Sequence, residues 1–126
     1  MTKENLLKKI YGIYQTCKFA NWDKSNSLPI SEDTYKHALR FVSKLEKYNV
    51  SIENIKVSPL NDDNLNFCWS YNDGTSFNID FDRSNDTLIW CCYKDEKHIW
   101  DGVCIHFEDI VENLKKFINF HEGNKQ

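Results

Sequence analysis

The chain has 126 residues, a length typical of one domain, and its net charge is −3. Apolar residues make up 40% of it, enough for a hydrophobic core, while four Gly and two Pro exclude a linker-rich or low-complexity chain. The sequence begins without the apolar run of a signal peptide, and no later stretch is long enough to cross a bilayer, so we expect a cytoplasmic protein with no membrane partner.

The charge is distributed unevenly along the chain. Residues 1–57 hold ten Lys/Arg and six Asp/Glu, a balance of +4, whereas residues 58–107 hold three and nine, a balance of −6. Residues 108–126 hold three and four, a balance of −1. Because an acidic block repels phosphates, the sequence predicts no direct binding of nucleic acid and favours a basic protein surface as partner. The alternative is that these carboxylates are merely solvated on turns and strand faces.

Two helices are predicted in the first part of the chain. Apolar residues recur at helical spacing over about residues 3–19, which predicts the first helix. The second is expected over about residues 32–48, with Ser31 as its N-cap. Glu32 and Asp33 then lie in its first turn, where the helix dipole favours negative charge.

The apolar period changes from 3.6 to 2 after the second helix, which is typical of strands. The predicted strands span about residues 54–59, 64–71, 75–82, 86–93 and 98–107. Asn72-Asp73-Gly74 is a strong hairpin signal between the second and third of them, and Pro59 confines the first to a sheet edge. A last helix is expected over about residues 108–120, followed by a frayed tail.

Short elements with one apolar stripe must share a core to bury it. The sequence therefore predicts a single α+β domain over residues 1–126. Its centre is an antiparallel meander of four to five strands. Two N-terminal helices and one C-terminal helix are expected to pack on one face of this sheet.

The five cysteines show no CxxC spacing, so we expect reduced thiols rather than a zinc site. Cys104 and His106 would share a face of the last strand, as a thiolate and its base can. However, their Cα atoms would be ~7 Å apart on a strand, and no third residue nearby in sequence would orient them. The sequence therefore favours a small buried thiol near an exposed or capping His.

Carboxylates gather around the third predicted strand. Asp80 and Asp82 share its polar face, and Asp62 and Asp63 precede it in the chain. Such groups can bind a hard cation or transfer protons. The stretch DFDRSND resembles a calcium loop, but Thr87 and Tyr93 stand where that loop needs Gly and Glu. The sequence therefore predicts a solvated acidic sheet face, with no metal and no other cofactor.

The four Trp differ in their expected roles. Trp69 is in phase with the apolar face of the second strand and is predicted to lie in the core. Trp90 and Trp100 are either core residues or exposed anchors for a partner, because large aromatic side chains dominate protein interfaces. Trp22 stands in the polar stretch after the first helix, where its ring can cover the gap between the first two helices or face a partner.

These residues give the chain a resemblance to a set of small uncharacterised bacterial and phage proteins. The matching pieces are Trp22-Asp23, Pro29-Ile30-Ser31, Ala38, Phe41-Val42, Pro59 and Leu65-Phe67-Trp69, within about residues 19–82. The chain departs from the pattern at Lys24, where Gly is expected, and at Asp62-Asp63, where a Gly-containing turn is expected. Genes of such proteins often lie in mobile or defence-related neighbourhoods, so the resemblance implies an interaction protein without enzyme activity.

The sequence as a whole predicts a small acidic inhibitor that occludes a basic, nucleic-acid-handling surface of a partner protein. Phage counter-defence (anti-CRISPR-like) factors, immunity proteins and antitoxins act in this way. The predicted partner-binding residues are Trp22, Asp62, Asp63, Asp80, Asp82, Trp90 and Trp100, and no catalytic residue is predicted. Two alternatives stay open: a Cys/His or carboxylate/metal-dependent hydrolase, and a homodimeric regulatory module that pairs through a strand edge.

Overall fold

The computed structural model describes residues 1–82, 87–104 and 106–123. Its helices are α1 (Lys3–Cys17), α2 (Glu32–Lys47) and α3 (Val111–Glu122), with a short 3-10 helix, η1 (Phe107–Asp109), before α3. Its strands are β1 (Ile55–Leu60), β2 (Asn64–Ser70), β3 (Thr75–Asp82), β4 (Thr87–Lys94) and β5 (Lys97–Cys104). These elements confirm the predicted α+β fold; the expected start of the fourth strand at residue 86 lies outside the described residues.

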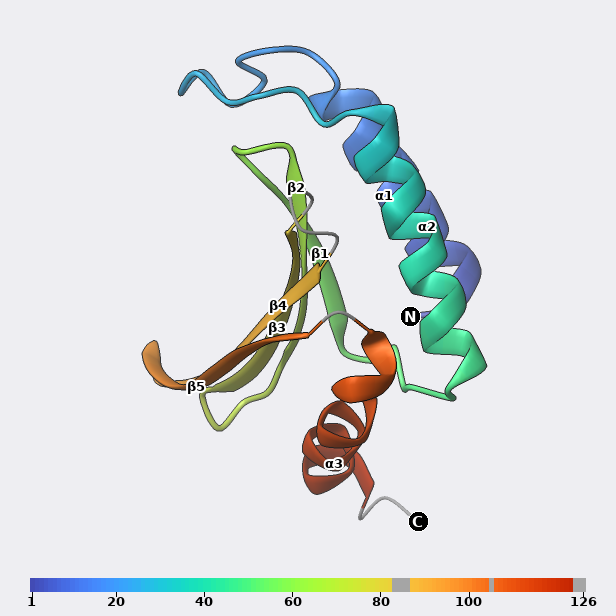
Figure 1. Ribbon diagram of the computed structural model, residues 1–126, viewed down its shortest axis with the longest axis vertical. Coiled ribbons are helices and arrows are strands. Elements are labelled where there is room, and N and C mark those ends of the chain that lie inside the picture. The colour runs from blue at the N-terminus through green and yellow to red at the C-terminus, as the bar shows by residue number, and fades with distance from the viewer. Residues whose placement is uncertain (83–86, 105, 124–126) are drawn as a thin grey trace.

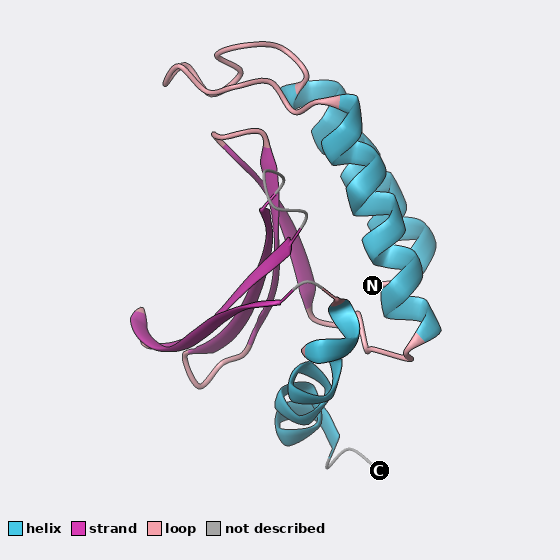
Figure 2. Cartoon of the chain, viewed as in Figure 1, coloured by secondary structure: helices cyan, strands magenta, loops and turns pink. Residues whose placement is uncertain are grey.

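The strands form one antiparallel sheet in the order β1-β2-β3-β4-β5, so each strand pairs with its neighbour in the chain. Gly74, with φ of 84°, makes the tight turn between β2 and β3, as the hairpin signal predicts. Figures 1 and 2 show α1 and α2 as an antiparallel pair on one side of the sheet, which we call the inner face, with α3 at its lower end. Within the described ranges, no helix covers the opposite side, which we call the outer face.

Local sequence explains where the two long helices begin. The Thr2 hydroxyl accepts from the Asn5 N–H at 3.1 Å, and the Ser31 hydroxyl accepts from the Thr34 N–H at 3.2 Å. Each bond satisfies one of the backbone donors that a helix start leaves unpaired. The predicted N-cap of the second helix is therefore confirmed. None of the described helices is long and apolar enough to span a membrane.

The core lies between the inner face of the sheet and the helices. Phe67 and Trp69 are fully buried there, as predicted for Trp69, whose indole N–H donates to the Ser51 carbonyl at 2.9 Å. The Phe41 ring of α2 lies 4.7 Å from that of Phe67, centre to centre. Such aromatic pairs contribute beyond the area that they bury.

The end of the chain differs from the sequence prediction. The last strand ends at Cys104 rather than at residue 107, because Phe107 leaves the sheet to pack edge-on to Phe41 at 5.3 Å. Phe107 is fully buried, so the core gains a large ring. His121 and Glu122, expected in the frayed tail, belong to α3 instead.

Candidate functional site

Trp22 belongs to the loop between α1 and α2 and is half-buried against the core. Its indole N–H donates to the Leu28 carbonyl at 2.9 Å, so its polar group is used inside the chain. Lys24, which stands where the resemblance expects Gly, has φ of 63°, in the left-handed region that favours glycine. The Trp22 ring thus holds this loop together, and only the exposed part of the ring is left for a partner.

Asp63 is turned toward α2, contrary to the expected outward acidic face. Its Oδ1 accepts from the Ser31 N–H at 2.7 Å and from the Thr34 hydroxyl at 2.9 Å. A φ of 61° allows the turn after β1 to present the carboxylate in this direction. Asp63 therefore stabilises the start of α2, where negative charge is favourable.

Asp80 lies on the outer face of β3, half-buried between neighbouring polar side chains. The Asn66 amide donates to its Oδ1 at 2.7 Å. Burial raises the pKa of the Asp80 carboxyl; the Asn66 bond acts in the opposite direction, and the nearby charge of Asp62 raises this pKa further. Asp62 and Asp80 therefore share one region of negative potential. The side chain of Asp82 lies outside the described residues.

Asp101 adds a third carboxylate to the outer face, and the sequence analysis missed it. It is paired in register with Cys91, which is paired with Asn78 of β3. The charges of Asp80 and Asp101 both raise the pKa of the Cys91 thiol, after the larger effect of its burial. The alternation along the strand could have predicted this position. Trp100 and Gly102 flank Asp101 and share one face of the strand, so Asp101 belongs to the other face.

Trp90 and Trp100 lie on the inner face, on the other side of the sheet from Asp80 and Asp101. Trp90 is 8% exposed, and its ring stacks on Phe77 with 5.8 Å between centres. Gly102 leaves the space that this ring fills, because a Cβ there would lie 2.6 Å from Trp90 Cζ2. Trp100 meets Trp90 edge-on at 4.9 Å and stays half-exposed. The structure therefore assigns Trp90 to the core and Trp100 to the surface.

An apolar groove opens beside Trp100, between β5 and α3. Its volume is about 350 Å³. The side chains that form most of its wall are Phe77, Cys92, Ile99, Trp100, Phe117 and Phe120. The predicted residues thus fall on two separate surfaces, with carboxylates on the outer face and an aromatic groove on the inner one.

The cysteines do not have the properties of a catalytic nucleophile. Burial raises the pKa of the thiols of Cys68, Cys91 and Cys104, and it raises the pKa of Cys92 to about 11. A nucleophilic thiol needs the opposite shift, because the thiolate is the reactive form. Within the described part of the chain, no group of three His, Cys, Asp or Glu side chains is placed to hold a metal ion.

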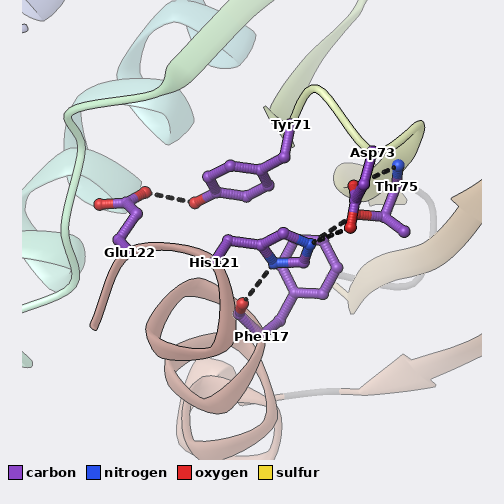
Figure 3. A network of polar contacts seen from close by, with 6 residues as sticks. All are labelled: Tyr71, Asp73, Thr75, Phe117, His121 and Glu122. Atoms are coloured by element: carbon purple, nitrogen blue, oxygen red, sulfur yellow. Dashed lines mark hydrogen bonds and ion pairs between the residues drawn. The ribbon is translucent and has the colours of Figure 1, made fainter. Parts of the chain in front are cut away.

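A polar cluster that the sequence analysis missed joins α3 to the hairpin between β2 and β3 (Figure 3). His121 Nε2 lies 3.0 Å from Asp73 Oδ2, its Nδ1–H donates to the Phe117 carbonyl at 2.9 Å, and its ring stacks on that of Tyr71 at 4.1 Å. The Tyr71 hydroxyl donates to Glu122. The cluster ties the end of α3 to the sheet, which accounts for the ordered helix beyond residue 120.

Asp73 gives this cluster a testable acid dependence. The Thr75 hydroxyl and backbone N–H donate to its carboxylate and lower the pKa of Asp73 to about 2, and His121 acts in the same direction. Because the pKa of Asp73 is lower in the folded state than its ordinary value of 3.8, this carboxylate stabilises the protein at pH values above 3.8. The contribution is lost as the pH falls from 3.8 toward 2. We expect Thr75→Val to move the Asp73 midpoint upward in an NMR titration of its carboxyl carbon. An unchanged midpoint would show that the Thr75 hydroxyl does not set it.

The described residues therefore offer two surfaces for a partner and one internal polar cluster. The outer face carries Asp80 and Asp101, with the charge of Asp62 nearby in the turn after β1, whereas the groove on the inner face carries Trp100 and Phe120. Comparisons with protein-family models, with curated proteins and with solved structures found no match to this chain.

Proposed function

We propose that this protein binds another protein through the outer face of its sheet and occludes a basic surface that handles nucleic acid. The observation that carries the proposal is the uncovered sheet face with Asp80 and Asp101, and with the charge of Asp62 nearby. Inhibitors of the immunity-protein, antitoxin or phage counter-defence type work by such occlusion. We place this activity in the cytoplasm, where the five free cysteines stay reduced.

The sheet holds these carboxylates in position before a partner arrives. Asp80 lies on β3 and Asp101 on β5, both of which pair with β4, and the Asn66 amide fixes Asp80 further. Groups that are already ordered lose little conformational entropy on binding. Arginine side chains of a phosphate-binding site also pair well with carboxylates. The reason is that phosphates and carboxylates both present oxygen acceptors to the planar guanidinium group.

Charge makes the proposed contact selective. Lys56 lies on the edge strand β1 and pairs in register with Cys68, so a positive charge borders the carboxylates on this face. Complementary charge accelerates encounter with a basic partner and opposes like-charged ones. The raised thiol pKa values support binding over the alternative of a cysteine hydrolase.

The test compares two variants that each lose three negative charges. One is D62N/D80N/D101N on the outer face, and the matched control is E4Q/E32Q/E112Q, whose carboxylates are exposed on the helices. Each tagged chain is incubated with a lysate of the cells that express the protein naturally, at salt concentrations from about 50 mM to about 500 mM. We expect the parent chain and the helix control to retain a basic protein whose binding weakens with salt, and the face variant to retain it at least about tenfold more weakly.

Occlusion is then measured on the captured protein itself. The parent chain should displace a labelled DNA or RNA duplex from that protein, and the face variant should fail to do so at the same concentration. The proposal is wrong if the retained protein binds equally well to the face variant. It is also wrong if binding is insensitive to salt, or if the nucleic acid stays bound in the ternary mixture.

A further inference from the structure

The apolar groove between β5 and α3 depends on an irregularity in the sheet. Cys92 pairs with Trp100 and Tyr93 pairs with His98, so Ile99 is an extra residue in β5 at this bulge. Bulges commonly redirect a side chain near functional sites. Here, Ile99 and Trp100 are adjacent in the chain, yet both line the groove. In a regular strand they would point to opposite faces.

The groove exposes large apolar side chains that a core would bury. Ile99 is 58% exposed, Trp100 52% and Phe120 77%. These three side chains surround a volume of about 350 Å³, within the range of binding pockets in general. Contiguous exposed apolar surface of this kind is typical of interaction sites, and exposed Trp residues are common binding anchors.

The charge at the groove favours one kind of occupant. Lys116 of α3 is the only charged residue among the described residues that line it, and no ion pair joins Lys116 to a carboxylate of the described chain. An acidic group bound beside the groove would satisfy this ammonium. In a symmetric dimer through the groove, the Lys116 side chains of both copies would instead lie in the same interface and repel each other.

We propose that this groove binds an apolar, acidic segment of a partner protein. An aliphatic or aromatic side chain of the segment fills the groove against Trp100 and Phe117, and a neighbouring carboxylate pairs with Lys116. The site is separate from the outer face and has the opposite charge preference. It gives the protein a second docking surface that does not depend on the function proposed above.

The test uses a library of random peptides displayed on phage, with the intact protein as bait. Each peptide has about 12 residues, roughly the length of a short docking segment. We expect the enriched peptides to combine a large apolar residue with Asp or Glu a few positions away. The I99S/F120S variant should lose this enrichment, because both side chains belong to the groove wall. The matched control V103S removes an exposed apolar side chain of β5 outside that wall, and it should select the same peptides as the parent chain.

Charge reversal at Lys116 separates the proposal from unspecific apolar binding. K116E should change the accompanying residue of the selected peptides from acidic to basic, and D62N/D80N/D101N should leave the selection unchanged. Circular dichroism and thermal unfolding verify that each variant is folded. The proposal is overturned if I99S/F120S still enriches the same peptides, if K116E leaves their charge unaltered, or if the parent chain sediments as a dimer that I99S/F120S converts to a monomer.

Discussion

Replacing Phe67 by alanine lowers the free energy of unfolding by about 3–5 kcal/mol, the range expected for removing a buried Phe ring. Phe67 is 0% exposed and lies at the centre of the core, 4.7 Å from the Phe41 ring and 5.7 Å from the Phe81 ring. Its neighbours come from a strand and a helix, so they cannot all move in to fill the space. Urea denaturation followed by circular dichroism measures the loss.

Phe120→Ala is the matched control for this prediction. The same atoms are removed, but Phe120 is largely exposed on the rim of the groove, so the free energy of unfolding should change by no more than about 0.5 kcal/mol. Equal losses for the two variants would mean that Phe120 is covered in solution. Such a result would contradict an open groove between β5 and α3.

Replacing Gly102 by alanine lowers the free energy of unfolding by about 1–3 kcal/mol, as overpacking in a filled core does. The added Cβ would lie 2.6 Å from Trp90 Cζ2, so the indole ring has to move. Trp90 has little freedom to do so, because it is stacked on Phe77 and meets Trp100 edge-on at 4.9 Å. The near-ultraviolet circular dichroism of the Trp pair should change together with the stability.

Gly12→Ala should act in the opposite direction. Gly12 lies inside α1, and a Cβ there meets nothing within 4 Å. Alanine is the better helix former, so we expect the free energy of unfolding to rise by about 0.5–1 kcal/mol. Two glycine-to-alanine changes of opposite sign would be measured by the same urea titration. A Gly102→Ala variant as stable as the parent chain would show that Trp90 is not confined.

The two proposed docking surfaces lie on opposite faces of one sheet. A partner on the outer face meets carboxylates, whereas a segment in the groove meets aromatic rings and Lys116. The stability predictions and the binding tests therefore concern different residues, apart from Phe120. Loss of peptide selection by a folded I99S/F120S variant consequently reports on the groove, and loss of a basic partner by D62N/D80N/D101N reports on the outer face.

Local sequence determined most of the secondary structure and the fold class. Leu65, Phe67 and Trp69 alternate along β2 and all are buried, because strand geometry turns every second side chain to the same face. Ser31 begins α2 and Asn72-Asp73-Gly74 turns the chain, since caps and tight turns depend on groups only a few residues apart. The candidate site was predicted in part, as Asp80 on the outer face and Trp100 on the surface.

Only the tertiary structure decided the remaining features, because each depends on segments that are far apart in the chain. Asp63 reaches the start of α2 across 32 positions, and His121 reaches Asp73 across 48. Trp90 is buried because Gly102 on the neighbouring strand leaves room for it. The bulge that brings Ile99 and Trp100 into one groove follows from how β5 pairs with β4, and periodicity within a single strand carries no information about such pairing.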